Sequence, residues 1–373
     1  MKTKLLGNKR QSNIELLRII AMIMIVAHHI AVHSDFTFSA QDISINSLWI
    51  RLIELGGKIG VNIFVLISGF FMISSTKENH KKTVKLWLQI FSYSALIFLF
   101  AIFALEQDFG VKSLIKSIFP ITYSTWWFAS AYFVLYLLSP YINRLAQSLN
   151  KKSYARLLLL LFFCWSLVPT FLTVSWQSNS LLWFVFLYLL AGYIRLHLDI
   201  NKFKSSKCII CALAIMLLIY LSSVVFKILA MRFSIFEAYT TYFYSMEKLP
   251  ALFASLFLFV GFLNLKMGYS SIVNIISSAT FGVYLIHDNA YIRNALWVDL
   301  FKNQTYSSSA FLVPYTILQL VLVFAVCTVI ELARIHFIEK HYLGMISGFL
   351  ELVKKTRDKL ASSGVFQKLG KYL

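Results

Sequence analysis

The sequence predicts an all-α bundle of about ten transmembrane helices with both chain termini in the cytoplasm. Hydrophobic residues make up 59% of the 373 residues, only 14% are charged, and the mean hydropathy is +0.72. A soluble fold of this length cannot cover so much apolar surface. Apolar runs of about 18 or more residues recur along the chain, and basic residues gather in alternate connections between them. These observations together indicate a polytopic membrane protein.

The apolar runs follow one another with short charged or polar breaks between them. The expected spans are residues 14–33, 55–74, 84–105, 126–146, 154–173, 179–196, 208–230, 249–265, 270–288 and 309–336. The segments between them are loop-sized, so no separate soluble domain is expected. We expect a membrane-embedded domain over residues 1–340. A basic amphipathic tail, residues 341–373, is expected to lie along the inner membrane surface.

The distribution of lysine and arginine gives the bundle a direction. With the N-terminus inside, the outer loops hold few basic groups and most lie on the cytoplasmic side, facing anionic lipids. The inner clusters include Lys2, Lys4, Lys9, Arg10, Lys77, Lys81, Lys82, Lys85, Arg144, Lys151, Lys152, Arg156, Arg195, Lys202, Lys204 and Lys207. The net charge of +19 is therefore explained by membrane lipids, and no nucleic acid partner is expected.

The four cysteines lie in or beside apolar segments. Cys208 and Cys211 form a C-x-x-C pair, but no second pair of ligands accompanies it. We therefore interpret the cysteines as small core residues and expect no metal site.

Among the ionisable residues of the first span, Arg18 and His29 lie eleven positions apart. That spacing is just over three helical turns, so both side chains share a face, roughly 16 Å apart along the axis. Ionisable groups at membrane depth are costly and are functional candidates. Histidine suits proton transfer near neutral pH, and arginine binds phosphate or carboxylate. The structural alternative is an orienting ion pair between Glu15 and Arg18, with a histidine that caps the outer helix end.

Within the second span, residues 59–72 combine small and polar residues on one face, among them Ser68 and Gly69. Small residues allow close helix approach. The span is followed by Lys82 and Lys85, which offer cationic donors for an anionic group at the membrane surface. Helix packing and the usual inner excess of positive charge are the simpler explanation of this segment.

Taken together, these segments resemble the acyltransferase-3 family of integral membrane O-acyltransferases. The family's R-x10-H pattern matches Arg18 and His29, and residues 61–70, "VNIFVLISGF", match its second-span motif. Residues 126–143, "WWFASAYFVLYLLSPYIN", and 278–289, "SATFGVYLIHDN", resemble two further family segments. Two features depart from the pattern. Lys82 and Lys85 stand where many members carry an R-x-x-R pair, and "FIEKHYL" lacks the family's proline, so Glu339 receives no role.

The resemblance implies transfer of an acyl group, most often acetyl from acetyl-CoA, to a hydroxyl of a cell-surface polysaccharide or its lipid-linked precursor. Acyl-CoA would be the donor substrate, with no permanently bound cofactor, and the site would lie in the cell membrane, most plausibly a bacterial cytoplasmic membrane. The expected catalytic residues are His29, Arg18 and His287; the expected donor contacts are Arg18, Ser68, Lys82 and Lys85; and the expected acceptor contacts are Trp127, Tyr132 and Tyr284.

Several alternatives remain open at the level of sequence. His29 is expected to act as the general base, but transient acylation of the histidine is equally compatible with the pattern. His287 also fits a helix-end histidine bonded to the backbone, and the aromatic residues also fit an interfacial belt. A transporter or flippase of lipid-linked saccharides is the main rival function, although we see no internal repeat of the kind such proteins carry. A non-catalytic membrane sensor is the third possibility.

Overall fold

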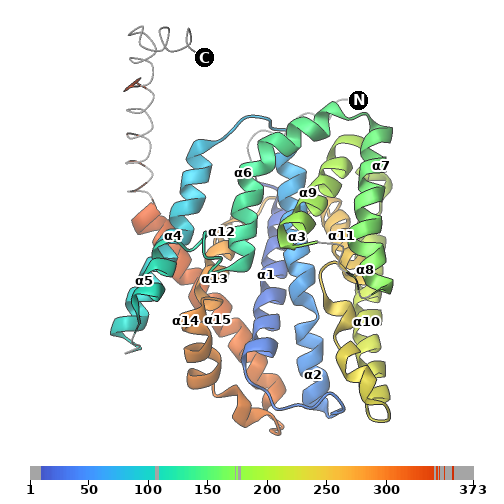
Figure 1. Cartoon of the computed structure of the whole chain (residues 1–373), viewed down its shortest axis with the longest axis vertical. Helices are drawn as coiled ribbons and strands as arrows, with labels where there is room; N and C mark the ends of the chain where they lie inside the picture. Colours follow the sequence, from blue (N-terminus) through green and yellow to red (C-terminus); the bar gives the residue numbers. More distant parts are fainter. Residues whose placement is uncertain are drawn as a thin grey trace.

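The computed structural model describes residues 10–105, 109–172, 174, 178–339, 342, 344, 348, 355 and 356. Over these residues it confirms the all-α bundle, with no strand (Figure 1). Eight helical stretches are long and apolar enough to cross a membrane. The predicted amphipathic tail, residues 341–373, lies almost entirely outside the described residues.

Each of the ten predicted spans corresponds to helix. They are α1 (Ser12–His33), α3 (Gly56–Met72), α4 (His80–Phe103), α6 (Trp127–Ser148), α7 (Lys151–Phe162) with α8 (Val168–Phe171), α9 (Ser180–His197), α10 (Ser205–Ala230), α11 (Leu249–Leu263), α12 (Ser271–Ser278) with α13 (Thr280–His287), and α15 (Leu312–Arg334). Two of these regions fall outside the eight stretches named above: α6, which is long enough but less apolar, and the shorter pair α12–α13.

The segments predicted as loops contain short helices. These are α2 (Ile45–Glu54), α5 (Val111–Ile118), α14 (Ala290–Arg293), and the 3-10 segments η3 (Ser234–Tyr239), η4 (Tyr242–Tyr244) and η6 (Asn303–Tyr306). Wider π-helical turns form η1 (Phe163–Leu167), η5 (Asn294–Leu300) and η7 (Ile335–Glu339), and a 3-10 turn forms η2 (Ile200–Lys202). The largest difference from the sequence prediction is α2, which runs almost directly into α3 at Leu55.

Helix α1 lies in the middle of the bundle (Figure 1). It packs against α2, α3, α11, α12, α13 and α15. The contact with α3 is close because α3 presents glycines to it: a Cβ atom built on Gly60 would lie 2.6 Å from the main-chain oxygen of Ala21. Small residues at helix interfaces permit this approach in membranes. The central helix is therefore held from several sides, which fixes the side chains that it carries.

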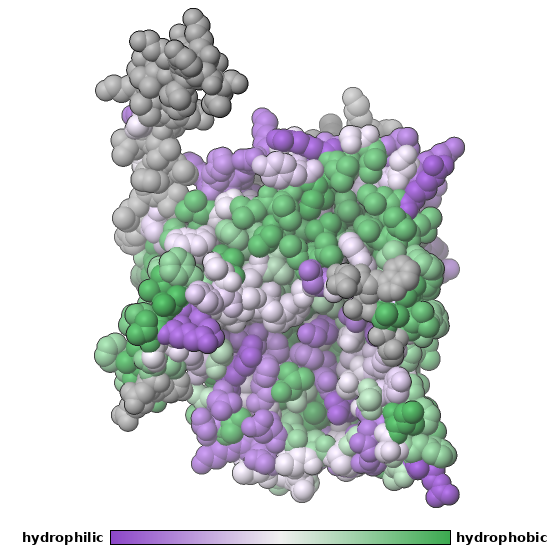
Figure 2. All heavy atoms as spheres, viewed as in Figure 1, coloured by the Kyte–Doolittle hydropathy of each residue, from purple (hydrophilic) through white to green (hydrophobic). Residues whose placement is uncertain are grey.

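Helices α1, α4 and α7 begin on one side of the bundle, the upper side of Figure 1, and α3, α6 and α9 run the opposite way. We call the two sides upper and lower. On the face seen in Figure 2, hydrophobic side chains cover much of the upper half, and hydrophilic side chains gather at the upper rim and at the lower centre. An apolar belt bounded by polar rims is the surface expected of a membrane-embedded bundle.

A buried ion-pair network joins α4, α13 and α15 in the upper half. The carboxylate of Glu331 accepts hydrogen bonds from Gln89 (2.8 Å), from Tyr93 (2.5 Å) and from Arg334 (2.7 and 2.9 Å). Gly282 of α13 lies directly against it, because a Cβ atom there would be 2.3 Å from Cδ of Glu331. A buried carboxylate is tolerated only when it is paired and hydrogen-bonded in this way.

Candidate active site

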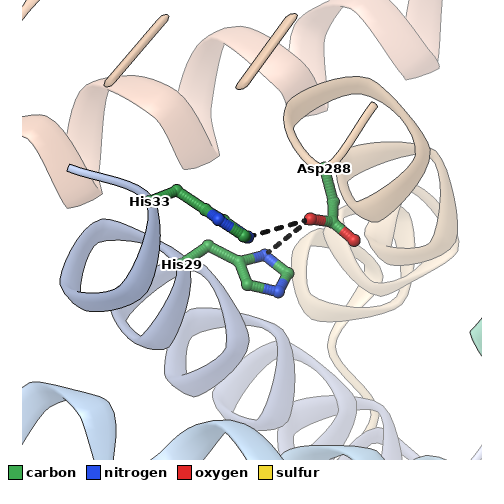
Figure 3. Close-up of side chains that lie close together, drawn as sticks. All are labelled: His29, His33 and Asp288. Carbon is green, nitrogen blue, oxygen red and sulfur yellow. Dashed lines mark ion pairs between the residues drawn. The ribbon is translucent and has the colours of Figure 1, made fainter. Parts of the chain in front are cut away.

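A cluster of three histidines and one aspartate lies where the lower end of α1 meets the end of α13. His29 and His33 are one helical turn apart on α1, and both point toward Asp288, which follows α13 (Figure 3). The Oδ1 atom of Asp288 is 3.7 Å from Nδ1 of His29 and 3.5 Å from Nε2 of His33. The same Nδ1 of His29 is 2.8 Å from Nε2 of His287. His29, His287 and Asp288 are all buried.

The hydrogen bonds of His287 determine which nitrogen of His29 carries the proton. Nδ1 of His287 lies 2.6 Å from the carbonyl oxygen of Val283, and a carbonyl can only accept, so this nitrogen is protonated. In neutral His287, Nε2 is then an acceptor, and Nδ1–H of His29 donates to it. Neutral His29 therefore has its lone pair on Nε2, the ring nitrogen that faces away from Asp288 in Figure 3. A histidine held in this tautomer is suited to accept a proton.

The carboxylate of Asp288 is itself held in place. Nε of Arg293 donates to Oδ1 of Asp288 at 2.9 Å, and His33 lies on the same oxygen. If His29 takes up a proton at Nε2, the negative charge of Asp288 stabilises the resulting imidazolium. An aspartate beside a histidine thus stabilises the protonated form of the ring by its charge.

The donor atoms of His29, His33 and Asp288 lie within 4.8 Å of one another, so these three residues could hold a metal ion. A cation there would have to break the bond from His29 to His287 and the pair of Asp288 with Arg293. It would also sit beside the fixed positive charge of Arg293, which repels it. The donor set therefore fits a proton-transfer network better than a metal centre.

His29 lines a small cavity of about 20 Å³. Its walls are formed by Met22, Ile25, His28, His29, Gly57, Lys58, Val61, Phe64, Trp127, Phe128, Phe281 and Tyr284. This volume holds about one water molecule. The hydroxyl of Tyr284 is buried near Asp288 and the main chain of Phe128, without a hydrogen bond of good geometry to either. The ammonium of Lys58 lies 4.7 Å from the centre of the Trp127 ring, within cation–π range.

The structure separates the three residues that the sequence predicted for acceptor binding. Trp127 and Tyr284 line the histidine cavity, whereas Tyr132 does not. The hydroxyl of Tyr132 is 3.0 Å from that of Ser68, which donates to the carbonyl oxygen of Phe64 at 2.9 Å. Ser68, predicted as a donor contact, is therefore paired with Tyr132 in this structure.

The residues predicted for the acyl donor lie in the upper half but not in one place. A hollow of about 460 Å³ opens between the end of α3, the start of α4 and the end of α6, and Lys77, His80 and Lys82 are among its lining residues. Lys85 instead forms an ion pair with Glu339. Arg18 lies 3.8 Å from Glu15, as the structural alternative expected.

Three residues in or near the cluster were not predicted from the sequence: His33, Lys58 and Arg293. His33 repeats the α1 face at i+4 from His29, a spacing that could have identified it. Lys58 and Arg293 carry no such signal, because they come from other elements and reach the site only through the tertiary fold. His28 is different: its Nδ1 bonds the carbonyl oxygen of Glu54 at 2.8 Å, which makes it a matched comparison for His29.

The fold and the site together define a multi-pass membrane protein with a buried cluster of histidines and an aspartate. Comparison with known families gives the class more closely: the family model described as an acyltransferase domain, acyltransferase-3, matches residues 11–332. The chain belongs to this family and is a membrane acyltransferase. No curated protein and no solved structure matches it.

The weakly bonded hydroxyl of Tyr284 predicts a difference in stability between two tyrosine variants. Tyr284→Phe should lower the thermal unfolding midpoint in detergent less than Tyr93→Phe does, because the Tyr284 hydroxyl makes no hydrogen bond of good geometry to Asp288 or to the main chain of Phe128. Tyr93→Phe, the matched control, should lower stability by about 1–3 kcal/mol, because Glu331 loses a buried hydrogen bond. Equal destabilisation by the two substitutions would show that the Tyr284 hydroxyl has a structural partner.

Proposed function

We propose that the protein transfers an acyl group, most simply acetyl, from acyl-CoA in the cytoplasm to a hydroxyl of a cell-surface polysaccharide or of its lipid-linked precursor. The observation that carries the proposal is the hydrogen-bond chain from His29 through His287 to Val283, which leaves the lone pair of neutral His29 on Nε2 in a chain of the acyltransferase-3 family. The upper side, where α4 and α7 begin with basic residues, is taken as cytoplasmic.

The proposed reaction is a direct transfer with His29 as general base. The acceptor hydroxyl gives its proton to Nε2 of His29 while its oxygen attacks the thioester carbonyl. The new C–O bond forms, the C–S bond breaks, and the CoA thiolate leaves and takes the proton back from His29. Asp288 stabilises the transient imidazolium across 3.7 Å, and His287 keeps the ring in orientation through Nδ1.

The donor is proposed to enter from the upper side. Lys82 lines a hollow large enough for a small ligand, and CoA is strongly anionic, so its phosphates match this surface. The α1 axis rises roughly 16 Å between Arg18 and His29, a length that an extended pantetheine arm can follow. Arg18 and Lys85 would exchange their present carboxylate partners, Glu15 and Glu339, for phosphate oxygens.

The small volume of the cavity beside His29 favours a transferase over a flippase of lipid-linked saccharides. A flippase must pass a sugar head group between the two sides, and the space beside His29 holds about one water molecule. A hydroxyl and a thioester carbonyl require far less room than a translocated saccharide. The alternative therefore has less support from the geometry.

The two adjacent histidines give the most direct functional prediction. Purified protein in nanodiscs is given labelled acetyl-CoA and surface polysaccharide whose esters have been removed with mild alkali. His29→Ala should lower the transfer rate by about 10²–10⁴-fold, the usual contribution of a general base. His28→Ala, the control, should stay within a few-fold of the unsubstituted protein, since its Nδ1 bonds a backbone carbonyl. Comparable activity of the two variants would refute the assignment.

The donor surface is tested by Lys82→Met. It should raise the KM for acetyl-CoA about threefold to tenfold, with a larger effect at low salt, because an exposed lysine acts through screened charge. Its kcat should be unchanged. Lys151→Met, an equally exposed lysine at the start of α7, should change neither constant. A normal KM for acetyl-CoA in the Lys82 variant would show that the donor does not bind at Lys82.

A further inference from the structure

A second hollow opens where α8 ends and α9 and α11 begin (Figure 1). Its volume is about 440 Å³, within the range of small-molecule pockets. The lining residues that matter here are Trp165, Trp183, Tyr242, Met246, Glu247 and Lys248. We call it the tryptophan pocket. None of its residues belongs to the histidine cavity described above.

The polar atoms of Trp183 and Tyr242 in its aromatic wall are already bonded to the protein. Nε1 of Trp183 donates to Oδ1 of Asn62 at 2.9 Å, and the hydroxyl of Tyr242 donates to the carbonyl oxygens of Pro169 (3.2 Å) and Thr170 (3.1 Å). The ammonium of Lys248 lies 3.9 Å from the Tyr242 ring centre. The rings are thus held rigidly. Such a wall offers flat apolar surface at little entropic cost to a ligand.

One strong acceptor in the pocket is left for a ligand. The main-chain oxygen of Glu247 accepts a hydrogen bond from Ser166 at 2.6 Å, which fixes the backbone at this position. Its side chain is partly exposed, and among the described residues no group hydrogen-bonds or ion-pairs with the carboxylate. An ionised carboxylate accepts hydrogen bonds at two oxygens. It suits a ligand that carries hydroxyl donors.

The tryptophan pocket and the histidine cavity share a wall. Phe184, next to Trp183, packs against Trp127 with ring centres 6.1 Å apart. The side-chain amide of Asn62, which holds Trp183, also donates to the carbonyl oxygen of Met246 at 2.9 Å. One turn earlier on α3, Lys58 lines the histidine cavity and interacts electrostatically with both Glu247 and Asp288. A ligand in the pocket would therefore lie across the rings of Phe184 and Trp127 from the histidine cavity.

The size of the histidine cavity requires such a neighbouring site. About 20 Å³ admits a hydroxyl but no sugar ring. A glycan acceptor must therefore be held next to the cavity while one hydroxyl enters it. A pyranose ring has apolar C–H faces and a rim of hydroxyls, which matches rigid indole and phenol surfaces combined with a free carboxylate.

We propose that the tryptophan pocket binds a neutral sugar ring of the acceptor glycan. The ring stacks on Trp165, and its hydroxyls donate to Glu247. Trp127, expected from the sequence to contact the acceptor, lies between this pocket and the histidine cavity. This inference rests on the proposed function for the identity of the ligand, because the acceptor is assumed to be a glycan.

The test separates acceptor binding from chemistry. The probe is surface polysaccharide of the cells that make the protein, with its esters removed by mild alkali. Binding of this probe to the full-length protein in nanodiscs is measured alongside acetyl transfer. Trp165→Ala and Glu247→Gln should each weaken glycan binding and raise the acceptor KM about tenfold, with the KM for acetyl-CoA unchanged. Trp87→Ala, which removes a partly exposed tryptophan of α4 outside both spaces, is the matched control and should change none of them.

The outcomes for the pocket and for the proposed function are distinct. If the unsubstituted protein binds the glycan but transfers no acetyl group, the proposed function fails, while weaker binding by Trp165→Ala still supports the pocket. If transfer occurs and both pocket variants keep normal acceptor binding and KM, the pocket is wrong and the function stands. The proposed sugar pocket is also wrong if Trp165→Ala and Glu247→Gln lose the use of acetyl-CoA. It is wrong as well if Trp87→Ala weakens glycan binding as much as they do. Absence of glycan binding by the unsubstituted protein overturns the pocket directly.

Discussion

The hydrogen bond from Nδ1–H of His29 to Nε2 of His287 is the interaction on which the site depends. Its direction is imposed by a third atom, the carbonyl oxygen of Val283, which accepts the Nδ1 proton of His287. Because both acceptors are fixed on α13, the lone pair of neutral His29 is held on Nε2. Loss of this acceptor would leave a buried donor unsatisfied, at a cost of roughly 1–3 kcal/mol, and would free the ring to change tautomer.

The bundle around this bond keeps it in place. Helix α1 is held by glycines of α3 on one flank and by α12, α13 and α15 on another. The buried Glu331 network fastens α13 to α4 and α15, with Gly282 in direct contact with the carboxylate. A displacement of α13 by one helical turn would remove His287 and Asp288 together. The buried ion pairs around Glu331 in the upper half thus help to hold His287 and Asp288 beside His29 in the lower half.

Much of the fold was predictable from the sequence because hydropathy is a local property. All ten apolar runs are helical, and the R-x10-H spacing correctly marked His29 as a buried residue on the central helix. The short helix α2 was missed, because its polar residues and its position beside a predicted span resemble a loop. The pairing of Lys85 with Glu339 was also unpredicted, since it joins residues that are far apart in the chain.

The sequence identified several residues of the site but did not predict how they are arranged. His287 and Tyr284 were identified through the family resemblance, but the tautomer of His29 depends on an atom of Val283 that no motif marks. Tyr132 and Ser68 were predicted for different substrates, and the structure joins them to each other. Lys58 and Arg293 required the tertiary fold, because isolated basic residues near helix ends are usually interfacial.

The most direct measurement is the tautomeric state of His29, obtained by nitrogen NMR on protein labelled with ¹⁵N-histidine in lipid bilayers. The His29 signals are assigned by their loss in His29→Gln. At a pH where the ring is neutral, we predict a protonated Nδ1 and a bare Nε2. In His287→Phe, this preference should be lost. A proton on Nε2 of neutral His29 in the unsubstituted protein would contradict the account, because the nitrogen proposed to accept the hydroxyl proton would then have no lone pair.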